Sequence, residues 1–342
     1  MPTLNLQYYK GPDAYSDGAI EDELLHLVEK PQEFMAVLAH DDRWPLLYHL
    51  SPERRNLLEW YPFRRDAALL EIGAGCGALT GLFAERVAQV TAVELSAKRS
   101  RIIERRYADI LNLEIMAGNF TDMVFDRAFD YVTLIGVLEY ARTFIQTPDP
   151  YGRLLSRIAS VLKPGGVLIV AVENRLGLKY FAGARDDHTG RQFDGIEGYP
   201  AGGPETFTRN ELGQLLHIGG FAEQMFYYPH PDYKLPAEIF SDACLPAANH
   251  MLADAPNYDQ ERLKLFSEQR AWTTIIRDGK FPQFANSFLV LAARGQDVER
   301  LAWSVRGGGG EITDDGQQTA VLIRGAAAVH AVQPRSAFRG RN

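Results

Sequence analysis

The stretch LLEIGAGCGALTG, residues 69–81, decides the fold of this 342-residue chain. A short apolar run leads into glycines at 73, 75 and 77, and an acidic residue, Glu71, lies two places before the first of them. Glycines directly after a buried strand let a ligand approach the backbone closely. The stretch therefore predicts a strand, a turn and a ligand-binding site, without naming the ligand.

Short apolar runs alternate with helical patterns along the rest of the chain. The runs expected to form strands are residues 67–73, 89–95, 113–119, 129–136, 166–174, 221–229 and 286–294. The first five are short and rich in β-branched residues, which is typical of strands that are buried on both faces. This order predicts an α/β fold with a doubly wound, mostly parallel sheet of seven strands.

Other segments lie outside this regular pattern. Residues 1–65 are expected to form a helical cap ahead of a core that spans 66–295. Within the core, the glycine- and aromatic-rich loop 175–207 and the insertion 230–285 are expected to bind the substrate. Residues 296–342 form a glycine-rich tail or begin a further module.

Composition argues against several classes of function. The net charge is −8, and no run of Lys and Arg is long enough to follow a phosphate backbone, so nucleic acid is not an expected partner. No apolar run approaches the roughly 18 residues that cross a bilayer. The two cysteines, Cys76 and Cys244, fit a reduced compartment. We therefore expect a cytoplasmic protein that binds no membrane, and a homodimer is compatible with the sequence.

A carboxylate at the end of the next apolar run narrows the choice of ligand. Glu94 lies 21 residues after Gly73, in the position that binds the two hydroxyls of a ribose. These residues alone admit both NAD and S-adenosylmethionine. Glu71 would repel a phosphate but attract a cation, and Gly77 completes a flat G-x-G-x-G turn that does not present a helix N-terminus to pyrophosphate. Both features favour S-adenosylmethionine.

Together with VLKPGGVLIV (161–170), a helix end followed directly by a strand, these segments resemble class I S-adenosylmethionine-dependent methyltransferases over about two-thirds of the chain. LLEIGAGCGALTG resembles their first motif, VTAVELS the segment with the ribose acid, and AGNF the adenine-side loop. FDYVTLIGVLEYA and VLKPGGVLIVAVEN resemble their fourth and fifth strands. In this family a reversed last strand closes the sheet, which suits NSFLVLAAR (286–294).

The resemblance implies a cofactor site for S-adenosylmethionine. It places the glycine turn beside the methionine moiety, Glu94 beside the ribose, and Asn119 with Phe120 beside adenine, although the family often has Asp at position 119. Tyr15 belongs to a tyrosine-rich segment that would fold over the cofactor. The expected cofactor-binding residues are Tyr15, Glu71, Gly73, Ala74, Gly75, Gly77, Glu94, Leu95, Asn119, Phe120 and Gly136.

The same resemblance places the second substrate beyond the ends of the fourth and fifth strands. The residues expected to act in catalysis are Glu139, Glu173 and His188, of which His188 is the leading candidate for a general base. The residues expected to bind the acceptor are Tyr140, Asn174, Arg175, Asp187, Tyr199 and His230. No ligand spacing indicates a metal site, and none is expected.

The sequence thus predicts transfer of a methyl group from S-adenosylmethionine to a hydroxyl of a small molecule or glycan. The loop that follows the fifth strand is also similar to those of methyltransferases from bacterial polysaccharide and natural-product clusters. Two alternatives stay open: an N-methyltransferase, including the ribosomal-RNA adenine type, and a scaffold that binds the cofactor without transfer. The RNA adenine enzymes need an Asn-(Leu/Ile)-Pro-(Tyr/Phe) turn where this chain reads GVLEYA.

Overall fold

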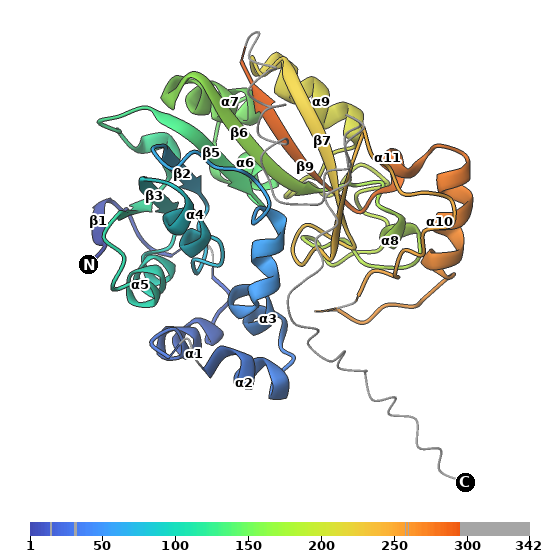
Figure 1. Ribbon diagram of the computed structural model, residues 1–342, viewed down its shortest axis with the longest axis horizontal. Helices are drawn as coiled ribbons and strands as arrows, with labels where there is room; N and C mark the ends of the chain where they lie inside the picture. The colour runs from blue at the N-terminus through green and yellow to red at the C-terminus, as the bar shows by residue number, and fades with distance from the viewer. Residues whose placement is uncertain (14–15, 31–32, 257, 259, 295–342) are drawn as a thin grey trace, which may run out of the picture.

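The computed structural model describes residues 1–294, apart from 14–15, 31–32, 257 and 259, so the predicted tail 296–342 lies outside the described residues. At its centre is a nine-stranded sheet (Figure 1). The strands are β1 (Thr3–Tyr8), β2 (Ala68–Ile72), β3 (Gln89–Glu94), β4 (Leu113–Gly118), β5 (Phe129–Ile135), β6 (Leu162–Glu173), β7 (Glu223–His230), β8 (Glu238–Ser241) and β9 (Ser287–Ala293). The α-helices are α1 (Ile20–Leu27), α2 (Phe34–His40), α3 (Trp44–Leu50), α4 (Thr80–Arg86), α5 (Ala97–Arg106), α6 (Ala141–Phe144), α7 (Pro150–Val161), α8 (Leu178–Phe181), α9 (Arg209–Ile218), α10 (Glu268–Arg277) and α11 (Phe281–Phe284), with 3-10 turns η2 (Pro52–Leu57), η3 (Phe120–Asp122) and η4 (Leu138–Tyr140).

The strand order is β1-β4-β3-β2-β5-β6-β9-β7-β8. β2 pairs in parallel with both β3 and β5, so the order reverses between β2 and β5. β9 runs antiparallel between β6 and β7. The predicted doubly wound, mostly parallel class and the reversed strand near the end of the core are therefore confirmed. Ligands of such sheets bind where the order reverses, at the carboxyl ends of the strands.

The prediction of seven strands is wrong, because the sheet has nine. The two additional strands lie at its edges. β1 comes from the segment expected to be a helical cap and pairs in parallel with β4, while β8 comes from the insertion and pairs antiparallel with β7. The side chains of β1 are half-buried or exposed. An edge strand of this kind lacks the continuous apolar run by which the central strands are recognised.

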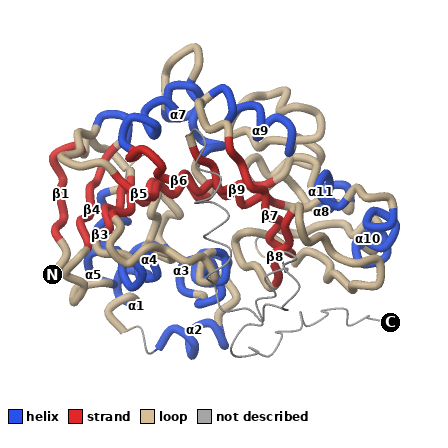
Figure 2. The backbone as a smooth tube through the Cα atoms, turned by 45° about the horizontal axis from the view of Figure 1, so that its top comes forward, coloured by secondary structure: helices blue, strands red, loops and turns tan. Residues whose placement is uncertain are grey.

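Helices cover both faces of the sheet (Figure 2). On one face, Val170 of β6 belongs to a core with Leu155 of α7 and Leu212 of α9. On the other face, the adjacent residue Ile169 belongs to a core with Phe83 of α4. Because neighbouring residues of a strand point to opposite faces, both faces must be apolar, and this explains the unbroken apolar runs of the central strands.

The N-terminal helices pack beside the glycine turn and α5. Leu24 of α1 and Leu46 of α3 share a small apolar core with Cys76 of the turn. Arg99 of α5, which is buried, pairs with Glu21 at 2.7 Å and with Asp17 at 2.7 Å. The cap is therefore fixed against the segment that follows β2, which brings it to the edge of the ligand site.

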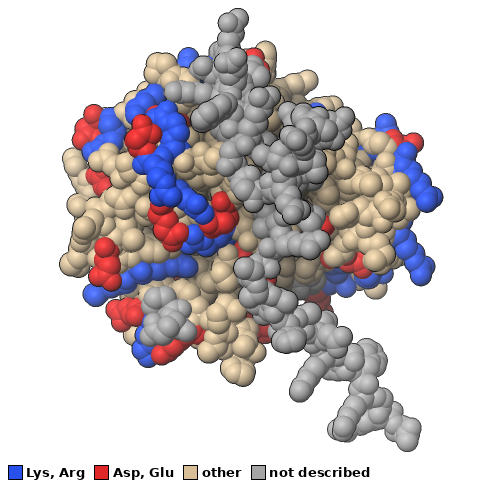
Figure 3. Space-filling view, viewed as in Figure 1, with Lys and Arg blue, Asp and Glu red and all other residues tan. Residues whose placement is uncertain are grey.

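The surface carries charges of both signs. On the face shown in Figure 3, Lys and Arg are interspersed with Asp and Glu. Oppositely charged side chains form pairs, such as Arg55 with Glu85 at 2.5 Å. A surface of mixed sign generates little of the long-range field that attracts a polyanion. Within the described part of the chain, each helix is too short or too polar to span a lipid bilayer.

Candidate active site

The glycine turn after β2 opens onto a cavity. Gly73 has a φ of 75°, a conformation that residues with a side chain rarely adopt. A Cβ atom at this position would lie 2.3 Å from Cγ2 of Val137, which follows β5. Glycine therefore allows the ends of the two central strands to approach each other where the strand order reverses.

The cavity has a volume of about 440 Å³ and reaches from the glycine turn to the loop 175–207. One end is lined by seven of the predicted cofactor residues: Gly73, Gly75, Glu94, Leu95, Asn119, Phe120 and Gly136. The other end is lined by two predicted catalytic residues and two predicted acceptor residues: Glu139, His188, Tyr140 and Asp187. Residues predicted to bind the donor and residues predicted to act on the acceptor therefore line one continuous cavity.

Glu94 is the last residue of β3 and forms part of the cavity wall. Its Oε2 accepts a hydrogen bond from the backbone N–H of Gly75 at 2.8 Å, and its Oε1 accepts one from Ser96 at 2.9 Å. A carboxylate oxygen can accept more than one hydrogen bond. The two backbone contacts therefore fix the carboxylate while leaving it the capacity to bind two ribose hydroxyls.

Asn119 begins the turn that follows β4. Its Oδ1 accepts a hydrogen bond from the N–H of Thr121 at 3.0 Å, and its Nδ2 donates one to the carbonyl of Phe144 at 3.2 Å. The amide thus holds the loop in place, with one N–H remaining for a ligand. Phe120, the next residue, offers an apolar surface at the same end of the cavity.

Glu71, Ala74 and Gly77 do not line the cavity. The side chain of Glu71 is buried, and its Oε2 accepts a hydrogen bond from Oγ1 of Thr80 at 2.6 Å. Burial raises the pKa of Glu71 to about 8, so its carboxyl is mostly neutral at pH 7. Its position does not support the expected attraction of a cation. Tyr15, the remaining predicted cofactor residue, lies outside the described residues.

The buried carboxyl of Glu71 should make stability depend on pH. In the unfolded chain it ionises near its usual value of 4.5, whereas in the folded chain it ionises near 8. The unfolded state therefore releases this proton first, and the free energy of unfolding falls as pH rises between these values, by up to about 1.4 kcal/mol per pH unit. We expect Glu71→Gln to remove this decline. Urea unfolding of both proteins at pH 5 and pH 8 measures it, and parallel pH dependences would contradict the expectation.

Glu139 lies in η4, directly after β5, and faces the other end of the cavity. Its side chain is 0 % exposed, and neither carboxylate oxygen accepts a hydrogen bond within the described part of the chain. Burial, together with the nearby charge of Glu173, raises the pKa of Glu139 to about 7. This carboxylate is therefore available to a bound acceptor.

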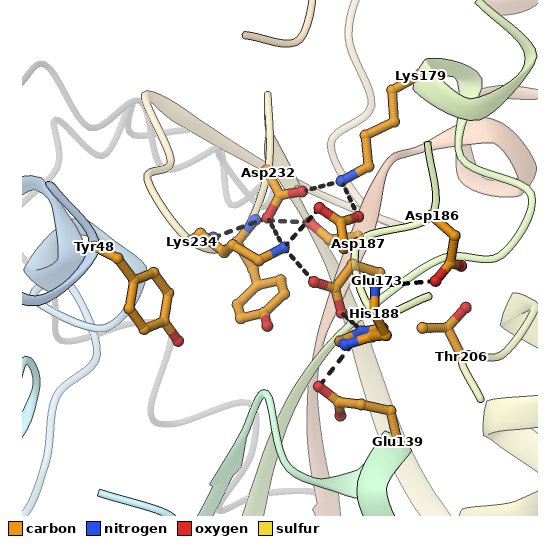
Figure 4. A network of polar contacts seen from close by, with 12 residues as sticks. Tyr48, Glu139, Glu173, Lys179, Asp186, Asp187, His188, Thr206, Asp232 and Lys234 are labelled. Carbon is orange, nitrogen blue, oxygen red and sulfur yellow. Dashed lines mark hydrogen bonds and ion pairs between the residues drawn. The ribbon is translucent and has the colours of Figure 1, made fainter. Parts of the chain in front are cut away.

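His188 lies between two carboxylates (Figure 4). Its Nε2 is 3.3 Å from Oε2 of Glu173 and 3.9 Å from Oε1 of Glu139, and its Nδ1 is 3.0 Å from the hydroxyl of Tyr140. Burial disfavours the charged imidazole, but the two glutamates outweigh this effect and raise the pKa of His188 to about 9. An imidazole that already carries a proton at pH 7 is a poor general base, which makes the predicted role fit Glu139 better.

A chain of alternating charges holds the acceptor end together (Figure 4). Lys234 contacts Glu173 directly and lies 3.5 Å from both Asp187 and Asp232. Lys179 lies 2.8 Å from Asp187 and 2.7 Å from Asp232. These ion pairs join the loop 175–207 to the insertion, so the two segments that were expected to bind the substrate form one wall.

Five of the residues predicted for catalysis or acceptor binding do not line the cavity: Glu173, Asn174, Arg175, Tyr199 and His230. Glu173 still reaches the site through its contacts with His188 and Lys234. The other four bind elsewhere in the protein: Asn174 donates to the carbonyls of residues 283 and 285, and His230 is bonded to the carbonyl of residue 253 at 3.1 Å. Arg175 donates to the carbonyl of residue 206, and the hydroxyl of Tyr199 bonds to the side chains of residues 186 and 206.

Sequence reasoning missed several residues of the cavity wall. Trp44 of α3 stacks on Tyr258 of the insertion, with ring centroids 4.9 Å apart, and Tyr48 lies beside Trp44. No local pattern connects these distant segments. Lys234 did leave a signal, because Asp232 and Lys234 flank a tyrosine in the same proline-rich stretch as His230.

Part of this chain is similar in sequence to known proteins. Residues 70–170, which contain the glycine turn, Glu94 and Glu139, match the family described as methyltransferase domain. This chain carries a class I S-adenosylmethionine-dependent methyltransferase domain. The methyl donor of this class is S-adenosylmethionine.

The methyltransferase domain is similar to several curated proteins. It is 35% identical over 122 residues to the cypemycin N-terminal methyltransferase of Streptomyces sp, covering 34% of this chain and 47% of that protein. It is 28% identical over 132 residues to the ubiquinone biosynthesis O-methyltransferase of Xanthomonas campestris pv. campestris (strain B100), covering 38% and 52%. The chain thus spans about half the length of the curated relatives it matches. A solved S-adenosylmethionine-dependent methyltransferase from Clostridium acetobutylicum ATCC 824 is 12% identical, with a TM-score of 0.41 over 71% of this chain and 92% of that one.

The cavity of the methyltransferase domain fits this methyl donor. The oxygens of Glu94 have bonding capacity left for a ribose, and the glycine turn exposes backbone to the same cavity. Phe120 provides an apolar surface for a base. These residues would hold the nucleoside, and Gly73 and Gly75 would border the methionine moiety.

Proposed function

We propose that this protein transfers the methyl group of S-adenosylmethionine to a hydroxyl oxygen of a small polar acceptor or glycan. The observation that carries the proposal is the buried carboxylate of Glu139, which has no hydrogen-bond partner among the described residues and faces the cavity that holds the glycine turn. A hydroxyl must lose its proton as it attacks a methyl group, and Glu139 is placed to receive it.

The residues of the cavity divide this work between its two ends. The donor supplies a methyl group that its positive sulfur makes electrophilic. Glu94 and the glycine turn anchor the nucleoside, and Glu139 with the loop 175–207 positions the acceptor, so that the reactants meet in line. A carbon–oxygen bond forms as the sulfur–carbon bond breaks, and the hydroxyl proton passes to a carboxylate oxygen of Glu139. Most of the rate enhancement would come from positioning.

The wall around the acceptor end indicates its chemistry. Trp44, Tyr48 and Tyr258 provide aromatic surface, while Asp187 and Lys179 provide charged groups that hydrogen-bond. Such a mixture suits a hydroxylated acceptor that presents both an apolar face and polar groups. This supports a sugar or a hydroxylated ring as the acceptor.

Methylation of an amine is the second candidate. The carboxylate of Glu139, which accepts no hydrogen bond from the described residues, would also bind an ammonium group and accept its proton. One of the relatives named above is an N-terminal methyltransferase and another an O-methyltransferase, so both types of acceptor have to be tested.

The test is a transfer assay with S-adenosylmethionine labelled on its methyl group. The purified chain is incubated with hydroxylated sugars, glycans and phenols, and in parallel with amines. We expect label in hydroxyl acceptors. Label in amines alone would support the second candidate. Binding of the donor without transfer to any acceptor would contradict both and favour a cofactor-binding scaffold.

A further inference from the structure

Glu139 has an unusual environment for a buried carboxylate. Its side chain is 0 % exposed, yet neither oxygen accepts a hydrogen bond from any residue that the structure describes. Nε2 of His188 lies 3.9 Å from Oε1, beyond hydrogen-bond distance. A buried polar group without a partner is costly, and each such group in a folded protein needs an explanation, such as an ion that binds there.

A second carboxylate and an imidazole complete a set of three metal-ligating groups. Glu139, Glu173 and His188 each offer one atom, and these atoms all lie within 4.8 Å of one another. Oε2 of Glu173 is 3.3 Å from the same Nε2 of His188. One ion at about 2 Å from each atom would connect them after small movements of the side chains.

Two of these groups, His188 and Glu173, already have the second contacts that orient metal ligands. Nδ1 of His188 lies 3.0 Å from the hydroxyl of Tyr140, and Lys234 contacts Oε1 of Glu173. Metal-binding histidines bond to a second group through their other nitrogen, and metal-binding carboxylates are themselves hydrogen-bonded. These contacts aim Nε2 of His188 and Oε2 of Glu173 at the point that Glu139 faces.

The charged groups around this point have a net negative charge, which favours the binding of a cation. The groups that surround it are four carboxylates and two lysines: Glu139, Glu173, Asp187, Asp232, Lys179 and Lys234. The four carboxylates and two lysines carry a net charge of −2, of which the proton on His188 offsets only one, and a metal ion bound to His188 would take the place of that proton. A divalent cation neutralises that charge, and uncompensated charge is costly in a buried site.

We propose that Glu139, Glu173 and His188 bind one divalent metal ion at the acceptor end of the cavity. Two carboxylates and one imidazole suit Mn²⁺ or Zn²⁺ better than Ca²⁺, which prefers oxygen ligands alone. This differs from the sequence-based expectation of no metal, because the three ligands come from separate segments and meet only in the folded chain.

The position of the ion suggests its role. Glu139 and His188 line the cavity, so open coordination positions would face the acceptor and suit a hydroxyl oxygen. Neither oxygen of Glu139 accepts a hydrogen bond within the described residues, so one can bind the ion while the other faces the acceptor's proton. This role rests on the proposed function, whereas the binding of the ion does not.

Calorimetric titration of the full chain with MnCl₂, after treatment with EDTA, tests the site. We expect one Mn²⁺ per chain in the wild type. Glu139→Gln and His188→Gln each remove a ligand and should weaken binding by more than about 100-fold, and Tyr140→Phe, which removes the partner of Nδ1, by about 10-fold or more. ZnCl₂ should bind at the same stoichiometry, and CaCl₂ more weakly.

Glu238→Gln is the matched control, because Glu238 also faces a histidine, His250, at 2.9 Å but does not line the cavity. It should bind Mn²⁺ as the wild type does. Thermal unfolding and the affinity for S-adenosylhomocysteine show whether each variant is folded. If Glu139→Gln or His188→Gln does not fold, the Mn²⁺ affinity of Tyr140→Phe tests the site instead.

Two results would overturn the proposal: a wild type that binds neither Mn²⁺ nor Zn²⁺, or equal binding by the wild type, Glu139→Gln and Tyr140→Phe. The first would mean that protons neutralise the cluster. Failure of the proposed function looks different, because the chain would then bind the ion but methylate no acceptor. Methyl transfer by a chain that binds no metal would contradict the proposed metal site and leave the proposed function standing.

Discussion

Glu139→Gln is expected to lower turnover by at least about 100-fold, the scale of contribution made by a positioned proton acceptor. The amide has nearly the same shape as the carboxylate, but it neither receives the acceptor's proton nor carries a negative charge. Since the oxygens of Glu139 accept no hydrogen bond from the described residues, the substitution breaks no such bond in the wall. Turnover is measured with the acceptor found in the transfer assay, and the affinity for S-adenosylhomocysteine is measured by calorimetry.

The affinity measurement separates loss of chemistry from loss of the cavity. We expect S-adenosylhomocysteine to bind Glu139→Gln within about threefold of its wild-type affinity, because the residues expected to hold the nucleoside are at the other end of the cavity. Glu238→Gln again serves as the control and should keep its turnover. A variant at position 139 that retains more than a third of wild-type turnover would show that Glu139 has no chemical role.

Glu94→Ala is expected to weaken the affinity for S-adenosylhomocysteine by about 100-fold or more. Two hydrogen bonds between ribose hydroxyls and a carboxylate would be lost, each contributing about 1.5 kcal/mol or more. The variant also leaves the N–H groups of Gly75 and Ser96 without their partner, which loosens the turn. Calorimetry with S-adenosylhomocysteine measures the effect.

The conservative variant Glu94→Gln distinguishes binding from folding. Its amide oxygen still accepts hydrogen bonds, so the affinity should lie between those of the wild type and Glu94→Ala. Glu114→Ala, which changes a glutamate of the neighbouring strand that does not line the cavity, should bind normally. Affinity that is unchanged in Glu94→Ala, or tight binding of NAD by the wild type, would contradict the assignment of this site.

Much of the cavity wall around the glycine turn could be predicted because its signals are local in the sequence. The turn at Gly73 directly follows β2, and Glu94 ends the next strand, so two neighbouring parallel strands bring both to the same edge of the sheet. The exception is Glu71, which the sequence placed beside the donor. Strand residues alternate between the two faces of a sheet, and the sequence does not show how deeply each side chain is buried. Only the packing shows that the carboxyl of Glu71 is bonded to Thr80 and does not face the cavity.

The acceptor end could be predicted only in part. Glu173 ends β6, and Glu139 lies four residues after the end of β5, the neighbouring parallel strand, which places the two residues near each other. His188 was recognised as a polar residue of the long loop, but the partners that determine its charge were not. Asn174 and His230 looked like site residues because they are polar and follow strands, yet both are bonded to backbone carbonyls elsewhere.

The sequence by itself determined the α/β class, the central strands and the positions of the glycine turn and Glu94, because strands buried on both faces require continuous apolar runs and the glycine turn is read from adjacent residues. Only the tertiary structure decided the two edge strands, the aromatic wall and the contacts of His188 with Glu139 and Glu173. These depend on how a loop without periodicity packs against strand ends, and the contacts that direct such packing join residues far apart in the chain.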